Sequence, residues 1–191
     1  MKRLSKWFYL GSIIGGQVGG LVLLTAAVVL LVVSGIYTDY VLNLSYAGTW
    51  ALASSILLIL LGCAAILFGA TIWYLLLYRA WAVIQDGKAS TSPEKAVGFI
   101  FIPFYNFYWI FKAWYGFAQD YNHYLERYAL NTPKLAESLF LVFCIFFICS
   151  SIPFLNYLAG LPFLVIFIIT ANKTIDAVNS LLALQVGTIN K

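Results

Sequence analysis

Charged and reactive residue types are scarce in this chain of 191 residues. Charged residues make up 9% of it, and it contains one histidine, one methionine and three cysteines. Soluble domains carry about 25% charged residues, so this composition excludes an ordinary water-soluble fold. Hydrolases and transferases need a nucleophile with a base, or carboxylates and histidines around a metal, and one histidine supplies no such set. We therefore expect no enzyme activity, no cofactor and no metal site.

The cysteines give no sign of a disulfide. Cys63, Cys144 and Cys149 all lie in apolar stretches, and the last two point in different directions on a helix. We expect all three to be small buried side chains.

Hydrophobic residues, at 63% of the chain, form long stretches without any charge. These stretches are Trp7–Thr38, Tyr40–Tyr78, Ala96–Phe111 and Ser138–Asn172. A helix that rises ~1.5 Å per residue crosses the ~30 Å hydrocarbon core of a bilayer in about 20 residues. The sequence therefore predicts an all-α polytopic membrane protein, with residues 1–191 in a single integral membrane domain.

Transmembrane helices are predicted at residues 10–36, 50–78, 135–152 and 161–183. The last uncharged stretch is too long for one crossing, and Ser150 to Pro153, Asn156, Gly160 and Pro162 supply turn residues in its middle. If 96–111 does not span, every Lys and Arg falls on one side of the membrane. The positive-inside rule then favours four crossings with both termini cytoplasmic.

The net charge of +4 is expected to fix this topology and to contact anionic lipid headgroups, not nucleic acid. Lys2, Arg3 and Lys6 precede an apolar stretch that is too long for a cleavable signal peptide. We interpret the first helix as an uncleaved signal anchor.

Aromatic residues are densest from Ala96 to Phe117. Ser92 and Pro93 are typical of a helix start, as N-cap and first helical position. Pro103 removes a backbone donor, so it should break the helix between Pro103 and Asn106. We predict that 93–111 is a broken re-entrant or interfacial segment.

An amphipathic helix is predicted at residues 107–128. Its polar stripe holds Lys112, His123 and Arg127, which are candidate contacts for lipid headgroups. The opposite ring face consists of Phe107, Phe111, Trp114, Tyr115, Ala118, Tyr121, Leu125 and Tyr128. That face is suited to packing against the other helices, to seating in the membrane interface, or to docking a partner.

Glycines recur on two neighbouring faces of the first predicted helix. The two sets are Gly11, Gly15 and Gly19, and the offset pair Gly16 and Gly20. Small residues at this spacing let membrane helices approach closely, and Gln17 is placed to hydrogen-bond across the contact. The sequence leaves open whether the contact lies inside the monomer or with a partner.

A short repeat links two predicted breaks. Ile102-Pro-Phe-Tyr-Asn-Phe is echoed by Ile152-Pro-Phe-Leu-Asn-Tyr, which pairs Pro103 and Asn106 with Pro153 and Asn156. Paired broken segments form midplane sites in some transporters.

The chain also carries a motif order that resembles a known family. After the second apolar stretch come Arg79-Ala80, Ala96-Val97-Gly98, Phe101-Ile102-Pro103, Asn106 and Trp114. This pattern, with Ala-Val-Gly-x-x-Phe-Ile-Pro-x-x-Asn at its core, resembles a group of uncharacterised bacterial multi-pass membrane proteins over residues 50–185. The chain departs from it at Phe107-Tyr108-Trp109, where the family has Leu-Trp and a nearby Pro. The resemblance implies a multi-pass protein of the bacterial inner (plasma) membrane and no known activity.

The favoured functional prediction is a non-catalytic accessory or scaffold protein. It would pack against membrane lipids and against another integral membrane protein or a second copy. One alternative is a small channel or transporter for a neutral solute, built around the breaks at Pro103–Asn106 and Pro153–Asn156. A third is the binding or sensing of lipid headgroups.

Overall fold

The computed structural model describes residues 3–40 and 45–189, so Lys2 of the predicted anchor lies outside the described residues. All regular structure in the described ranges is helical. The chain forms two compact units: Leu10–Trp73, here called the hairpin unit, and Met1–Tyr9 with Tyr74–Lys191, here called the bundle unit.

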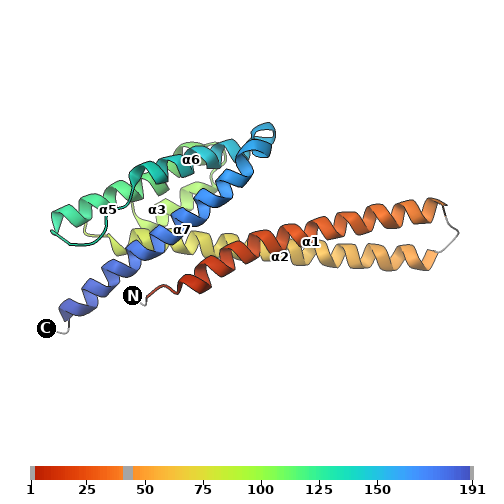
Figure 1. Ribbon diagram of the computed structural model, residues 1–191, viewed down its shortest axis with the longest axis horizontal. Helices are drawn as coiled ribbons and strands as arrows, with labels where there is room; N and C mark the ends of the chain where they lie inside the picture. Colours follow the sequence, from red (N-terminus) through yellow and green to blue (C-terminus); the bar gives the residue numbers. More distant parts are fainter. Residues whose placement is uncertain (1–2, 41–44, 190–191) are drawn as a thin grey trace. The chain divides into compact units, whose positions relative to one another are not determined.

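The hairpin unit consists of most of α1 (Lys6–Tyr40) and α2 (Ser45–Val83), which lie side by side and antiparallel (Figure 1). Both helices are apolar and long enough to cross a membrane, over Lys6–Gly35 and Trp50–Val83. They extend beyond the predicted 10–36 and 50–78 at both ends.

The bundle unit is built mainly from the end of α2 and the elements that follow it along the chain (Figure 1), and its core consists of large rings. These elements are α3 (Pro93–Gly98), a 3-10 turn (Phe99–Phe101), α4 (Tyr105–Ile110), a π-helical turn (Phe111–Tyr115), α5 (Gly116–Arg127), α6 (Glu137–Ser151) and α7 (Pro153–Ile189). Trp81, Trp114, Phe117 and Phe140 are fully buried. Because a buried ring makes many close contacts, ring packing supplies much of the dispersion energy that holds this unit together.

A third helix long enough to span a membrane lies within α7, over Leu158–Leu184. The prediction of an all-helical protein is therefore confirmed, and the described residues include three helices that are long and apolar enough to span a membrane. α6 has 15 residues, fewer than the ~20 that a straight helix needs for a crossing.

The turn between α6 and α7 is much tighter than the sequence indicated. α7 begins at Pro153 and not near residue 161, so Ile152 alone joins the two helices. Ile152 is extended, as a residue before proline prefers to be, and Pro153 fits the first helical turn because its missing N–H has no partner there. Asn156, Gly160 and Pro162, predicted as turn residues, are inside the helix.

Candidate functional site

The aromatic segment breaks where the sequence predicted. The Ser92 hydroxyl accepts a hydrogen bond from the Lys95 N–H and caps α3, and the helical path stops at Phe101. Phe104 then occupies the centre of a tight turn with φ +63°, in which the Tyr105 N–H donates to the Pro103 carbonyl at 2.7 Å. A positive φ at a residue with a Cβ costs about 1–2 kcal/mol.

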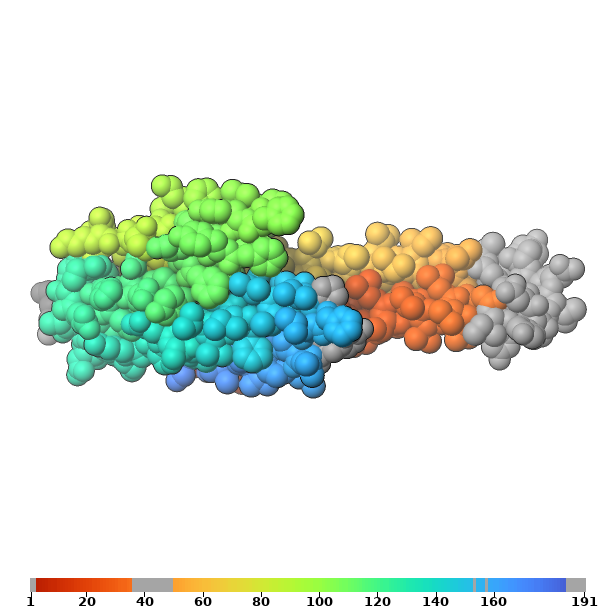
Figure 2. All heavy atoms as spheres, turned by 90° about the horizontal axis from the view of Figure 1, so that it is seen from above, coloured from red at the N-terminus to blue at the C-terminus, as the bar shows by residue number. Residues whose placement is uncertain are grey.

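The break exposes one side of this segment and anchors the other. The exposed side, here called the ring patch, consists of Phe101, Ile102, Phe104, Tyr105, Phe107 and Tyr108. Phe104 is 87% exposed, the most of these six. On the anchored side the buried Trp109 donates its indole N–H to the Ala96 carbonyl at 3.1 Å. In Figure 2 the green spheres of this aromatic segment lie at the surface of the molecule.

α4, the π-helical turn and α5 follow one another without a break from Tyr105 to Arg127, so nearly all of the residues predicted as one amphipathic helix, 107–128, are helical. Two buried side chains bind carbonyls at the π-helical turn: the Trp81 indole N–H donates to Ala113 at 2.9 Å and the Cys144 thiol to Ile110 at 3.5 Å. The extra residue of a π turn rotates the following helix relative to the preceding one. No periodic pattern in the sequence signals this turn, because it is fixed by partners on α2 and α6.

Half of the predicted ring face is core. Trp114, Ala118, Tyr121 and Leu125 are buried inside the bundle unit, and Trp114 packs edge-on against Phe143 of α6. Of the three roles open to this face, the structure supports packing against the protein's own helices for these four residues.

The three candidate headgroup residues have different surroundings. Lys112 lines a groove of about 280 Å³ beside the π-helical turn, together with Tyr108, Phe111 and Asp120. His123 is exposed. The Arg127 Nη2 atom lies 2.9 Å from the Asp86 carboxylate, so this guanidinium is already paired.

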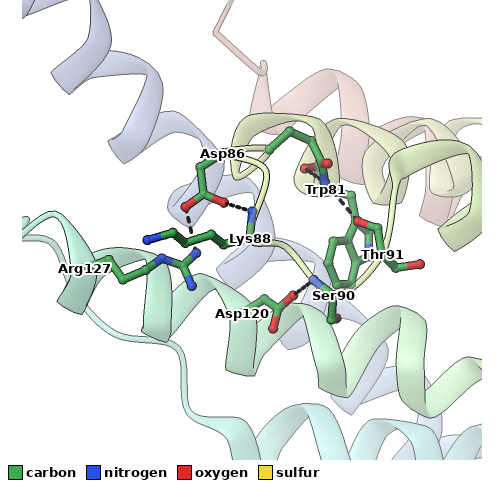
Figure 3. A network of polar contacts seen from close by, with 8 residues as sticks. Trp81, Asp86, Lys88, Ser90, Thr91, Asp120 and Arg127 are labelled. Carbon is green, nitrogen blue, oxygen red and sulfur yellow. Dashed lines mark hydrogen bonds and ion pairs between the residues drawn. The ribbon is translucent and has the colours of Figure 1, made fainter.

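That ion pair belongs to a network that fastens the loop after α2 to α5 (Figure 3). The Asp86 carboxylate also accepts from the Lys88 N–H at 2.8 Å, and the Asp120 carboxylate accepts from the Ser90 N–H at 2.6 Å. The Lys88 N–H and, less strongly, Arg127 hold the pKa of Asp86 below its ordinary value.

The two glycine faces of α1 have different surroundings within the hairpin unit. A Cβ built on Gly16 would lie 2.6 Å from the Ala65 carbonyl oxygen and 2.8 Å from the Gly69 Cα atom. A Cβ on Gly20 would lie 2.7 Å from the Gly62 carbonyl oxygen. Gly16 and Gly20 therefore form the close contact with α2.

Within the hairpin unit the second face, Gly11, Gly15 and Gly19, is open: a Cβ at each position meets no atom of the described residues within 4 Å. Gln17 is half-buried, and helical periodicity places it on nearly the opposite side of α1 from Gly15.

The two predicted breaks do not share a described cavity. The Asn106 side-chain oxygen is buried and accepts no hydrogen bond from the described residues, whereas the Asn156 side chain is exposed. Neither residue lines the groove at Lys112. Neither lines the second described cavity, which lies between α7 and the loop that precedes α6. Among the described residues there is no group of three or more His, Cys, Asp or Glu side chains that could hold a metal ion.

No family model, curated protein or solved structure matches this chain. The family resemblance therefore stays a prediction.

Proposed function

We propose that this protein is a non-catalytic accessory subunit of the bacterial inner membrane, which binds a helix of another membrane protein through the open glycine face of α1. The observation that carries the proposal is the contrast between the two faces of this helix. α2 occupies Gly16 and Gly20, while Gly11, Gly15 and Gly19 have open space above them.

The open face has the chemistry of a helix-docking surface. Val18 and Val22 are exposed beside the three glycines and form low ridges next to a bare backbone groove. In lipid the hydrophobic effect does not drive helices together, so association depends on close van der Waals packing, which small residues allow. A partner helix would gain these contacts on the Gly15 side without disturbing α2.

The ring patch supports a second attachment, to the bilayer surface. Phe101, Phe104 and Phe107 expose large apolar areas, while Tyr105 and Tyr108 carry hydroxyls suited to the headgroup boundary. Their exposure at a helix break agrees with an interfacial segment that lies among the lipids.

The favoured topology has four crossings with both termini cytoplasmic. The 15 residues of α6 rise about 22 Å, and Leu135 and Ala136 before it add roughly 7 Å if extended. The path from Lys134 to Ile152 then approaches the ~30 Å hydrocarbon thickness.

Extraction of the tagged protein into lipid nanodiscs, followed by mass spectrometry of what stays attached, tests the proposal. We expect a stoichiometric membrane protein with the wild type and its loss from Gly15→Leu. Gly35→Leu is the matched control, because a Cβ at Gly35 also meets no atom within 4 Å and helical periodicity places it on nearly the opposite side of α1 from Gly15.

A lone particle, or a partner retained equally by both leucine variants, contradicts this proposal. In the first case the solute-channel alternative becomes the next hypothesis, and flux of neutral solutes into liposomes would test it.

A further inference from the structure

A cavity of about 300 Å³ lies in the bundle unit between α7 and the loop that precedes α6. Its polar lining comes from Tyr121, Lys134, Lys173, Asp176 and Ser180. This volume is at the lower end of the range for small-molecule sites, which suits a headgroup better than a whole lipid.

The charges around the cavity leave one lysine without a counter-ion. Lys134 pairs with Glu126 at 2.6 Å, and Lys6 pairs with Asp176 at 2.5 Å. Lys173 makes no ion pair with an acidic side chain of the described residues. Asp176, the carboxylate that lines the cavity, is therefore paired with Lys6, and Lys173 is the lining cation that has no acidic partner among the described residues.

A buried hydroxyl in the lining also lacks a partner. Tyr121 is 1% exposed, and its hydroxyl, which lies near Thr132, makes no well-formed hydrogen bond to a described residue. A buried polar group left in this state costs about 1–3 kcal/mol. An acceptor oxygen of a ligand in the cavity would relieve that cost.

The cavity lies where apolar helices meet charged sequence. Lys173 is the first charged residue after the uncharged stretch Ser138–Asn172, and Lys6 begins the apolar α1. The Lys6–Asp176 pair and two hydrogen bonds between Leu4 and Asn179, at 2.7 and 2.9 Å, hold the start of the chain against α7 at this level. Basic pockets beside membrane helices at the cytoplasmic headgroup level suit anionic lipids.

We propose that this cavity binds the phosphate of an anionic phospholipid, with Lys173 pairing with its charge and the Tyr121 hydroxyl donating a hydrogen bond. The apolar surface of α7 above Lys173 would take the acyl chains. This site is distinct from the groove at Lys112 and does not depend on the docking face of α1.

Native mass spectrometry of the delipidated full-length protein in detergent tests the site, with phosphatidylglycerol and phosphatidylcholine as probes. We expect a preference for phosphatidylglycerol that falls roughly tenfold in Lys173→Gln, since charge-assisted hydrogen bonds are the strongest kind. Tyr121→Phe should weaken binding severalfold with little change in thermal stability, because the Tyr121 hydroxyl makes no well-formed hydrogen bond to a described residue.

Two further arms separate the sources of the effect. Lys112→Gln is the matched lysine variant and should bind phosphatidylglycerol like the wild type. If Lys112→Gln loses this binding while Lys173→Gln keeps it, the lipid binds in the groove at Lys112 and the proposal is overturned. Free glycerol 3-phosphate should not displace the lipid at equal concentration, and displacement would show a soluble-anion site instead. Equal binding of the two lipids by the wild type would also refute the proposal.

Discussion

Replacing Gly16 by alanine should open the contact between α1 and α2. The added Cβ would lie 2.6 Å from the Ala65 carbonyl oxygen and 2.8 Å from the Gly69 Cα atom, whereas ordinary contact begins at 3.4 Å. The obstacles are backbone atoms that cannot rotate away, so the helices must separate by about 0.6–0.8 Å at this point.

The expected cost follows from the lost dispersion energy. About 30 heavy-atom pairs at ~0.15 kcal/mol each would give ~4.5 kcal/mol for the crossing, and a gap of 0.5–1 Å forfeits a quarter to a half of it. The free energy of separating the hairpin should therefore fall by about 1–2 kcal/mol, within the ~1–3 kcal/mol typical of overpacked sites. Gly15→Ala should change it by less than about 0.5 kcal/mol, since its Cβ meets nothing within 4 Å.

Pyrene excimer emission can follow this equilibrium during titration with sodium dodecyl sulfate. The labels would be attached to cysteines at Val22 and Leu60, which are both exposed on the hairpin. The three native cysteines would be replaced by alanine in every variant, so that only the glycine position differs.

Similar midpoints for Gly16→Ala and the wild type would refute the close contact between α1 and α2. A larger loss for Gly15→Ala than for Gly16→Ala would mean that the two faces are assigned the wrong way round.

Three other predictions concern the bundle unit. Ser151→Cys, in the cysteine-free background, should react with a membrane-impermeant maleimide added outside intact spheroplasts, since four crossings place the turn between α6 and α7 at the outer surface. Protection of this cysteine until lysis would mean that α6 and α7 do not cross the membrane as a pair. Phe104→Gly should raise the unfolding free energy in detergent by about 1 kcal/mol, because glycine adopts positive φ without strain, and should reduce binding of the solubilised protein to vesicles; a lower stability would show that the turn is not strained. The pKa of Asp86 is lower in the folded protein than its unfolded value, near 3.8, so the ionised carboxylate stabilises the fold above that pH, and this stabilisation is lost as pH falls through the lower folded pKa. Asp86→Asn should therefore flatten the fall in melting temperature below pH 4. An acid profile identical to that of the wild type would exclude a contribution of Asp86 to acid unfolding.

Much of the architecture could be read from the residues. The uncharged stretches predicted the apolar helices, and Pro103 predicted the break in the aromatic segment, because helix length and a missing backbone donor are local properties. The end of α6 and the start of α7 were harder to place. Asn156, Gly160 and Pro162 have turn propensity, yet the turn after α6 already ends at Pro153. α7 continues through Pro162 and packs against α6.

The candidate surfaces were predicted less well. Two glycine faces were visible in the sequence, but spacing cannot say which one α2 covers. Likewise the ring face of residues 107–128 had three possible roles, and the burial of Trp114 and Tyr121 decided between them for the residues it includes. The cavity at Lys173 gave no sequence signal, since its lining comes from segments far apart in the chain.

The sequence by itself determined the all-helical character of this protein and the apolar helices that are long enough to span a membrane, because charge and apolar length are properties of each residue and its neighbours along the chain. Only the tertiary structure decided that Gly16 faces α2 while Gly15 stays open, that Arg127 is paired with Asp86, and that Lys173 and Tyr121 share a cavity. These outcomes depend on which surfaces meet in space. The free energy of such a contact depends on both elements that form it, so it cannot be read from the sequence of one helix.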